Sequence, residues 1–147
     1  MTNSFEAMTS LKDQLNDDSI LESYFNSTFD VAVETIIGVN EEQSDLKYPF
    51  IKIVFGSEQY ENVKLNYTSR TTMTCLVLYG VNELDGTKAE EYLSRITKEI
   101  KDAIERDIRL GGSVISIMVN GSTAKFETIG SQTPERIMEV NITFGGC

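Results

Sequence analysis

The sequence predicts an α+β domain: a mainly antiparallel sheet with an N-terminal helix and one long helix packed on one face. Apolar residues recur every three or four positions in some segments, which is the spacing of a helix that buries one stripe. In other segments they alternate with polar residues, as in antiparallel strands with one solvated face. These segments follow the order helix, strands, long helix, strands, which is typical of the α+β class. At 147 residues the chain is predicted to be a single domain, 1–147.

The N-terminal part of the chain predicts helix first and strand afterwards. A helix over 4–16 has Asn3 or Ser4 available as its N-cap. An apolar pair four positions apart predicts one or two further helical turns over 18–25. Alternation over 29–37 then predicts a strand with one polar face. The apolar stripe of the first helix consists of Phe5, Met8, Leu11 and Leu15.

The middle of the chain predicts two strands that flank an irregular segment. An acidic, polar loop over 38–47 leads to a near-continuous apolar strand over 50–55, which ends at Gly56. Clear alternation over 71–79 predicts the next strand, which ends at Gly80.

The segment 57–70 between these strands is the candidate interface with other subunits. It is longer than most connections, and it has apolar residues but no Pro or Gly, which disfavours disorder. Alternation within it predicts a projecting hairpin arm or an extended edge. Tyr and Arg are enriched at interface hot spots, although these side chains would equally cover the subunit's own core. The candidate interface residues are Glu58, Tyr60, Val63, Leu65, Tyr67 and Arg70.

A long helix is predicted from Thr87 to about Arg109. Thr87 and Glu90 match a capping box, in which both side chains accept hydrogen bonds from free backbone amides. Gly111 and Gly112 provide the left-handed stop. Oppositely charged residues four positions apart would add helix stability. These pairs are Glu91–Arg95, Asp102–Arg106 and Glu105–Arg109.

The C-terminal part predicts a β-meander. A strand over 114–119 precedes Asn120-Gly121, which is a typical hairpin turn. A return strand over 123–129 and a loop over 130–135 follow, and a strand over 136–144 closes the sheet.

Composition excludes several classes of function. The chain has no His, so His-based triads and His-ligated zinc are excluded. A net charge of −10 argues against a protein that binds nucleic-acid backbones, and residues 1–60 contain eleven acidic and three basic side chains. The acidic pairs Asp17-Asp18 and Glu41-Glu42 fit helix capping and solvated surface better than a metal site. Leu110-Gly111-Gly112 follows a helix, so it does not form a phosphate-binding loop. We therefore expect no cofactor, no metal and no catalytic residues.

The two cysteines and the chain start indicate a reducing compartment. Cys75 lies within an apolar run, and Cys147 is the last residue, so we expect no disulfide between them and a buried Cys75 thiol. No signal-peptide pattern and no apolar stretch of membrane-spanning length occurs.

Several short motifs in this order carry a family resemblance. They are Tyr48-Pro49-Phe50-Ile51-Lys52-Ile53, Gly56-Ser57-Glu58, Tyr79-Gly80, Asp107-x-x-Leu110-Gly111-Gly112 and Ile142-Thr143-Phe144-Gly145. Together with the order of helices and strands, this pattern resembles the tail terminator proteins of long-tailed bacteriophages, which cap the tail tube. The resemblance spans nearly the whole chain and contains no catalytic signature.

The resemblance implies a structural subunit of the virion tail, at its head-proximal end, that is assembled in the host cytoplasm. It implies a homo-oligomer, a hexameric ring stacked on the last ring of the tail tube protein, that ends tube polymerisation. The ring would present a docking surface to neck or connector proteins. DNA would pass through an acidic lumen without specific binding, since like charges repel, and no membrane would take part.

Other functions stay open from the sequence. Tail-completion and head–tail connector (neck) proteins share much of this pattern. A small-ligand-binding intracellular module would need a pocket between the long helix and the sheet. A carboxylate-dependent enzyme would need a specific acidic pair, which no strand end suggests.

Overall fold

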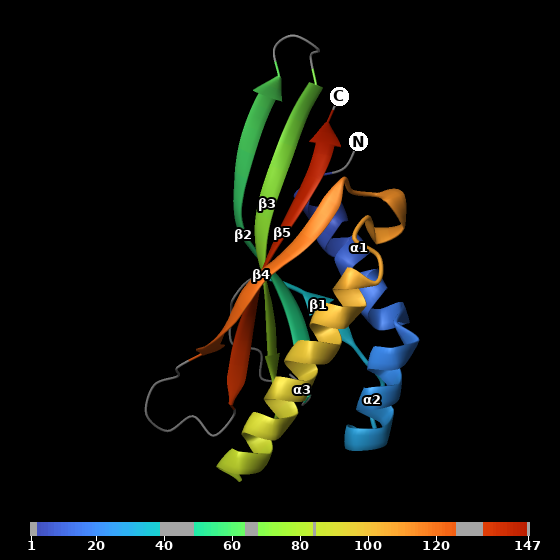
Figure 1. Ribbon diagram of the computed structural model, residues 1–147, viewed down its shortest axis with the longest axis vertical. Helices are drawn as coiled ribbons and strands as arrows, with labels where there is room; N and C mark the ends of the chain where they lie inside the picture. Colours follow the sequence, from blue (N-terminus) through green and yellow to red (C-terminus); the bar gives the residue numbers. More distant parts are fainter. Residues whose placement is uncertain (1–2, 39–48, 64–67, 84, 126–133, 147) are drawn as a thin grey trace.

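The computed structural model describes residues 3–38, 49–63, 68–83, 85–125 and 134–146. Three helices and five strands form an α+β fold, which confirms the predicted class (Figure 1). The helices are α1 (Ser4–Asp17), α2 (Ser19–Phe29) and α3 (Gly86–Glu105). The strands are β1 (Thr35–Ile37), β2 (Phe50–Val63), β3 (Thr68–Gly80), β4 (Ser116–Lys125) and β5 (Glu135–Gly146).

The five strands form one mixed, mostly antiparallel sheet in the order β1-β2-β3-β5-β4. β1 pairs in parallel with β2, and the other three pairings are antiparallel. The sheet is strongly twisted, and all three helices lie on one of its faces (Figure 1). α1 contacts β1 and β2, while α3 contacts β3, β4 and β5.

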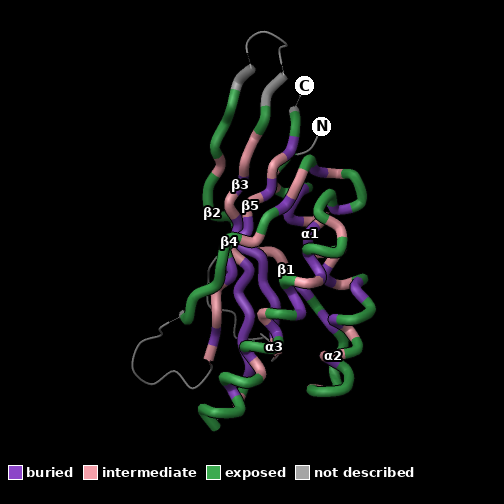
Figure 2. The backbone as a smooth tube through the Cα atoms, in the orientation of Figure 1, coloured by how far each residue is buried: buried purple, intermediate pink, exposed green. Residues whose placement is uncertain are grey.

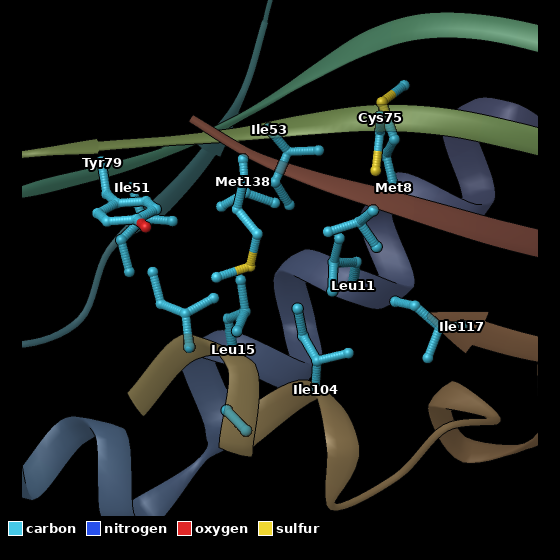
Figure 3. Close-up of a cluster of buried hydrophobic side chains, with 14 of the residues drawn as sticks. Met8, Leu11, Leu15, Ile51, Ile53, Cys75, Tyr79, Ile104, Ile117 and Met138 are labelled. Carbon is cyan, nitrogen blue, oxygen red and sulfur yellow. The ribbon is translucent and has the colours of Figure 1, made fainter. Parts of the chain in front are cut away.

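The main hydrophobic core lies between the helices and this face (Figure 3). The predicted stripe of α1 is confirmed for Met8, Leu11 and Leu15, which are buried there, but Phe5 is 65% exposed. The alternation of β3 is confirmed as well, because the side chains of every second residue from Met73 to Tyr79 are fully buried. Cys75 is one of them, so its predicted burial is also confirmed.

Two aspartates and one asparagine begin the helices. Asn3 caps α1 by accepting a hydrogen bond from the Glu6 amide. Asp18 caps α2, as its position in the acidic pair predicted. For α3 the predicted capping box is wrong: the cap is Asp85, whose carboxylate accepts hydrogen bonds from the Thr87 and Lys88 amides. The cap thus lies two residues before Thr87, and α3 begins at Gly86.

The predicted strand over 29–37 is wrong over most of its length. α2 continues to Phe29 because its ring packs edge-on against those of Phe25 and Tyr92. Asp30 ends the helix in the left-handed conformation, with φ of 57°. The strand β1 is therefore limited to Thr35–Ile37.

The predicted hairpin at Asn120-Gly121 is also wrong. β4 runs without a turn from Ser116 to Lys125, and its register with β5 shifts by one residue at this dipeptide. Asn120 and Gly121 thus form a β-bulge, because β4 pairs with β5 along its whole length. Most of the predicted return strand (126–129) and of the following loop (130–133) lies outside the described residues.

α3 ends at Glu105, four residues before the predicted Arg109. The Asp107 carboxylate then accepts hydrogen bonds from the Arg109 and Gly111 amides and forms a tight turn. Gly111 and Gly112 do adopt left-handed φ values of 72° and 90°, but they lie in a separate short turn, Leu110–Gly112. The prediction that they stop the long helix is therefore wrong, because α3 already ends at Glu105 with Arg106 as its right-handed C-cap. The ion pairs along α3 differ from those predicted: they are Arg95–Glu99, Lys98–Asp102 and Lys101–Glu105.

Candidate subunit-interface surface

Residues 57–70 belong mostly to a long β-hairpin that extends beyond the helices (Figure 1). Residues 57–63 are the end of β2, and 68–70 are the start of β3. We call these two stretches the arm. Along β2, the residues change from buried to exposed at the point where the strand extends beyond the helices (Figure 2).

A β-bulge at Gly56 marks the base of the arm. The register between β2 and β3 shifts between Phe55 and Ser57. A Cβ atom at Gly56 would lie 2.6 Å from the Thr74 carbonyl oxygen, so only glycine fits there without a shift of backbone. The glycine in the motif Gly56-Ser57-Glu58 therefore has a structural role: it permits the bulge that carries β2 into the arm.

Three of the six predicted interface residues have described side chains. Tyr60 is 70% exposed and Arg70 is exposed, while Glu58 is half-buried. Tyr60 therefore does not cover the core of its own subunit, which was the alternative to an interface role. The side chains of Val63, Leu65 and Tyr67 lie outside the described part of the chain.

Tyr60 and Glu58 lie on the same face of β2 and form a hydrogen bond, with the Tyr60 hydroxyl as donor. This hydrogen bond and the nearby carboxylate charge raise the pKa of Tyr60. The Tyr60 ring thus lies in the exposed arm, where a neighbouring surface can reach it.

Sequence reasoning missed three further apolar side chains at the edges of the sheet. Phe55 on β2 is 45% exposed and Met118 on β4 is 62% exposed. Ile115 comes just before β4 and is 43% exposed; its amide donates a hydrogen bond to the Thr143 carbonyl. The sequence contained one signal for such a surface: a large apolar residue, Met118, on a strand face predicted to be solvated.

The sheet face opposite the helices has two different regions. Near the base, Phe50, Val54 and Leu78 form a second, smaller apolar cluster. Toward the arm, the face has hydroxyl and amide side chains: the Thr74 hydroxyl donates to Asn141 Oδ1 at 2.8 Å. The upper part of this face is thus polar and bears few charges.

A surface groove of about 470 Å³ lies between α2 and α3. Arg95 lies over the Tyr24 ring, 5.1 Å from its centroid, and donates to the buried Glu99 carboxylate at 2.8 Å. The groove is thus on the side of α3 that faces α2, and the apolar stripe of α3 fills the space against the sheet. A ligand-binding module would need its pocket between α3 and the sheet, and buried side chains fill that space. The groove is lined by Tyr24, Thr28, Glu91, Tyr92, Ser94, Arg95 and Lys98.

Within the described residues, no three His, Cys, Asp or Glu side chains are grouped as metal ligands. Burial raises the pKa of the Cys75 thiol to about 12, so this thiol stays protonated and is a poor nucleophile at neutral pH. None of the helices in the described part of the chain has the length and apolar character needed to cross a membrane.

The fold is similar to that of a chain in a solved structure described as "Virion of native gene transfer agent (GTA) particle". The TM-score is 0.58 and the sequence identity is 9%, and the match covers 94% of this chain and 93% of that chain. At this identity the similarity concerns the fold. No protein-family model and no curated protein sequence matches the chain.

Proposed function

We propose that this chain is a structural subunit of a phage-like virion, a tail terminator that forms a ring on the tail tube. The observation that carries the proposal is the fold similarity to a chain of the gene transfer agent virion, which extends over 94% of this chain and 93% of that one. Two virion proteins of the same length and fold can differ in role, so the terminator role rests also on the sequence motifs.

The arm supports a function that works by contact. It exposes Tyr60 on β2 and Arg70 on its paired strand β3, away from the core. In a heterologous ring, one surface of each subunit meets a different surface of the next, so a projecting arm and a separate receiving surface are what such a ring needs. We propose a homo-hexamer with no enzymatic activity and no cofactor.

The ring ends tube polymerisation by covering the last ring of tube protein, and its other side binds the neck or connector proteins. With a net charge of −10 per chain, the lumen repels the phosphates of the passing DNA. A neutral or basic channel in the assembled ring would contradict this last step.

The experiment that tests the proposal is tube growth in vitro. The tube protein of the same virion is polymerised with and without this chain, and tube lengths are measured by electron microscopy. We expect short tubes with a cap at one end when the chain is present. Tubes of unchanged length and free ends would overturn the terminator role. Binding to the connector ring alone would instead favour the tail-completion role.

A further inference from the structure

The sheet has two open edges in the part of the chain that the structure describes. β1 covers only Ile51–Ile53 of β2, so from Val54 onward none of the described strands lies beside β2 on that side. At the other end of the sheet, β5 is the one described strand that pairs with β4 along Ser116–Lys125. Open edges present unpaired backbone donors and acceptors, and native proteins usually block or cover them.

The edge of β4 has one of the usual protections, the bulge at Asn120-Gly121, and residues 115–119 come before it. The ten residues of β4 contain no Pro, and the one charged residue among them is Lys125 at the far end. The two edges also account for four of the eight large apolar side chains that are exposed among the described residues: Phe55, Tyr60, Ile115 and Met118. Such apolar residues beside an open edge indicate a surface that is covered in the assembled state.

The directions of the two edge strands suit pairing between copies. β2 is antiparallel to β3, β3 to β5, and β5 to β4, so β2 and β4 run in opposite directions. Rotation about an axis along the strands preserves these directions. The β2 edge of one copy therefore meets the β4 edge of the next as an antiparallel neighbour, and the interface is heterologous, as a ring requires.

The register of the sheet places both edges at the same level. Across the four strands, Gln59 aligns with Thr72, Thr143 and Ser116, and Ser57 aligns with Thr74, Asn141 and Met118. Copies that meet without an axial offset thus oppose Gln59 to Ser116 and Ser57 to Met118.

The same register brings exposed apolar residues together. Tyr60 aligns through Thr71 with Phe144, which follows Thr143 on β5. Ser116 is opposite Thr143, so Ile115 lies at the level of Phe144. Copies in this register therefore oppose Tyr60 to Ile115 of the next copy, on the helix-bearing face of the sheet. On that face Phe55 aligns through Cys75 and Val140 with Val119. Pairing would cover Phe55 and Tyr60, each with an aliphatic side chain.

Pairing of like edges is less favourable. A β2–β2 contact would bring the Glu58 and Glu61 carboxylates of two copies together, whereas β4 offers them no acidic partner over Ser116–Lys125. A second copy with its β4 edge is therefore the occupant that the charges favour.

We infer that the subunits join by edge-to-edge strand pairing, with residues 55–60 of β2 antiparallel to Ile115 and the first four residues of β4 (116–119) in the next copy. This inference rests on the proposed ring and specifies its interface. The sheets of all subunits then form one continuous sheet around the ring, with the helices on one side.

Cysteine cross-linking tests the pairing. In a Cys147→Ser background, Ser57→Cys and Met118→Cys are combined in one chain and exposed to a mild oxidant. Directly opposed residues of antiparallel strands have Cα atoms about 4.5–5.5 Å apart, within disulfide range. Within one chain the two positions are three strand spacings apart, roughly 14 Å, so any disulfide joins different copies. We expect a ladder of covalent oligomers that is lost on reduction.

Two further variants complete the experiment. The pair Tyr60→Cys with Ile115→Cys tests the same register on the other face, and it should give the same ladder. Ser57→Cys with Thr123→Cys is the matched control, because Thr123 lies on the same strand and face but at the level of Ile137. It should give no ladder. Circular dichroism checks that each variant is folded.

The outcomes separate this inference from the proposed function. If rings form but neither in-register pair cross-links, or the control cross-links as well, the edge pairing is wrong and the ring stands. A ladder that stops at the dimer for both in-register pairs contradicts the head-to-tail pairing. If the unmodified chain forms no ring at any concentration, the edge pairing and the proposed ring both fail.

Discussion

The ion pair between Asp18 and Arg106 should be the most important single polar contact for the arrangement of the helices. Asp18 lies between α1 and α2, and its buried carboxylate accepts hydrogen bonds from Arg106 Nε and Nη2, both at 2.7 Å. The same carboxylate caps α2 through the Ile20 and Leu21 amides, at 3.1 and 2.9 Å. One side chain thus connects the α1–α2 corner to the end of α3.

The expected cost of removing it follows from these contacts. Loss of an N-cap costs about 1 kcal/mol, and loss of hydrogen bonds to a charged group costs about 1.5–3 kcal/mol. Because the Arg106 side chain is 34% exposed and can be hydrated, the cost stays below that of a fully buried pair. We expect Asp18→Ala to lower the free energy of unfolding by about 3 kcal/mol. Asp18→Asn keeps the cap and loses the ion pair, and it should cost about 2 kcal/mol.

The assay is urea unfolding followed by far-ultraviolet circular dichroism. Agreement between two protein concentrations shows that assembly does not contribute to the measured free energy of unfolding. Asp17→Ala is the matched control: Asp17 is the exposed neighbour, and its loss should cost less than about 0.5 kcal/mol. Equal losses for Asp18→Ala and Asp17→Ala would refute the reasoning.

Acid should remove the same contribution. Burial alone would raise the pKa of Asp18, but hydrogen bonds from Arg106 and the Leu21 amide outweigh burial and lower it below its ordinary value of 3.8. A carboxyl group with a lowered pKa stabilises the fold above its unfolded pKa, and this stability is lost as the pH falls through the folded pKa. The difference between the unmodified chain and Asp18→Asn should therefore narrow below pH 3.8.

Two further predictions concern glycine and cysteine. Gly80→Ala should lower the free energy of unfolding by about 1–3 kcal/mol, because a Cβ atom there would lie 2.7 Å from Phe50 Cε1. Gly121→Ala, also in a strand, meets no atom within 4 Å and should be nearly neutral; similar urea midpoints for the two variants would contradict this. In a Cys147→Ser background, Cys75 should not react with a thiol reagent at pH 8 until the protein unfolds, because burial raises its pKa to about 12; fast reaction of the folded protein would disprove its burial.

Periodicity predicted the parts of the fold in which local pattern and tertiary packing agree. The apolar residues of α3 from Ala89 to Ile104 recur every three or four positions, the spacing that predicts a one-sided helix, and nearly all of them are buried. The alternation of β3 likewise matches its buried and outward faces. In these segments one residue pattern satisfies both the backbone and the core.

The wrong predictions lie where one segment fits both a helix and a strand pattern, or where contacts with residues far away in the sequence determine the secondary structure. Phe25 and Phe29 are four residues apart, so the start of the alternating segment fits a helix equally well, and contact of Phe29 with the Tyr92 ring favours the helix. Asn120-Gly121 has the sequence of a hairpin turn, but pairing with β5 keeps β4 extended through it. The partner of β4 lies in the next strand segment and is not specified by the dipeptide.

The candidate interface was predictable only in part. An irregular segment with Tyr60 and Arg70 indicated an arm, and the structure places both in exposed strand positions. The role of the β4 edge was not predictable, because strand order decides which strands are edges. That order depends on contacts between residues far apart in the sequence.

The mass of the native particle tests the central claim most directly. Native mass spectrometry of the full chain, with electron micrographs of the same sample, measures how many copies assemble and whether they close. We predict a closed ring of six copies, six times the 16.5 kDa of one chain. A species that stays at the mass of one chain over the whole concentration range, and also in the presence of tube ends, would contradict the account.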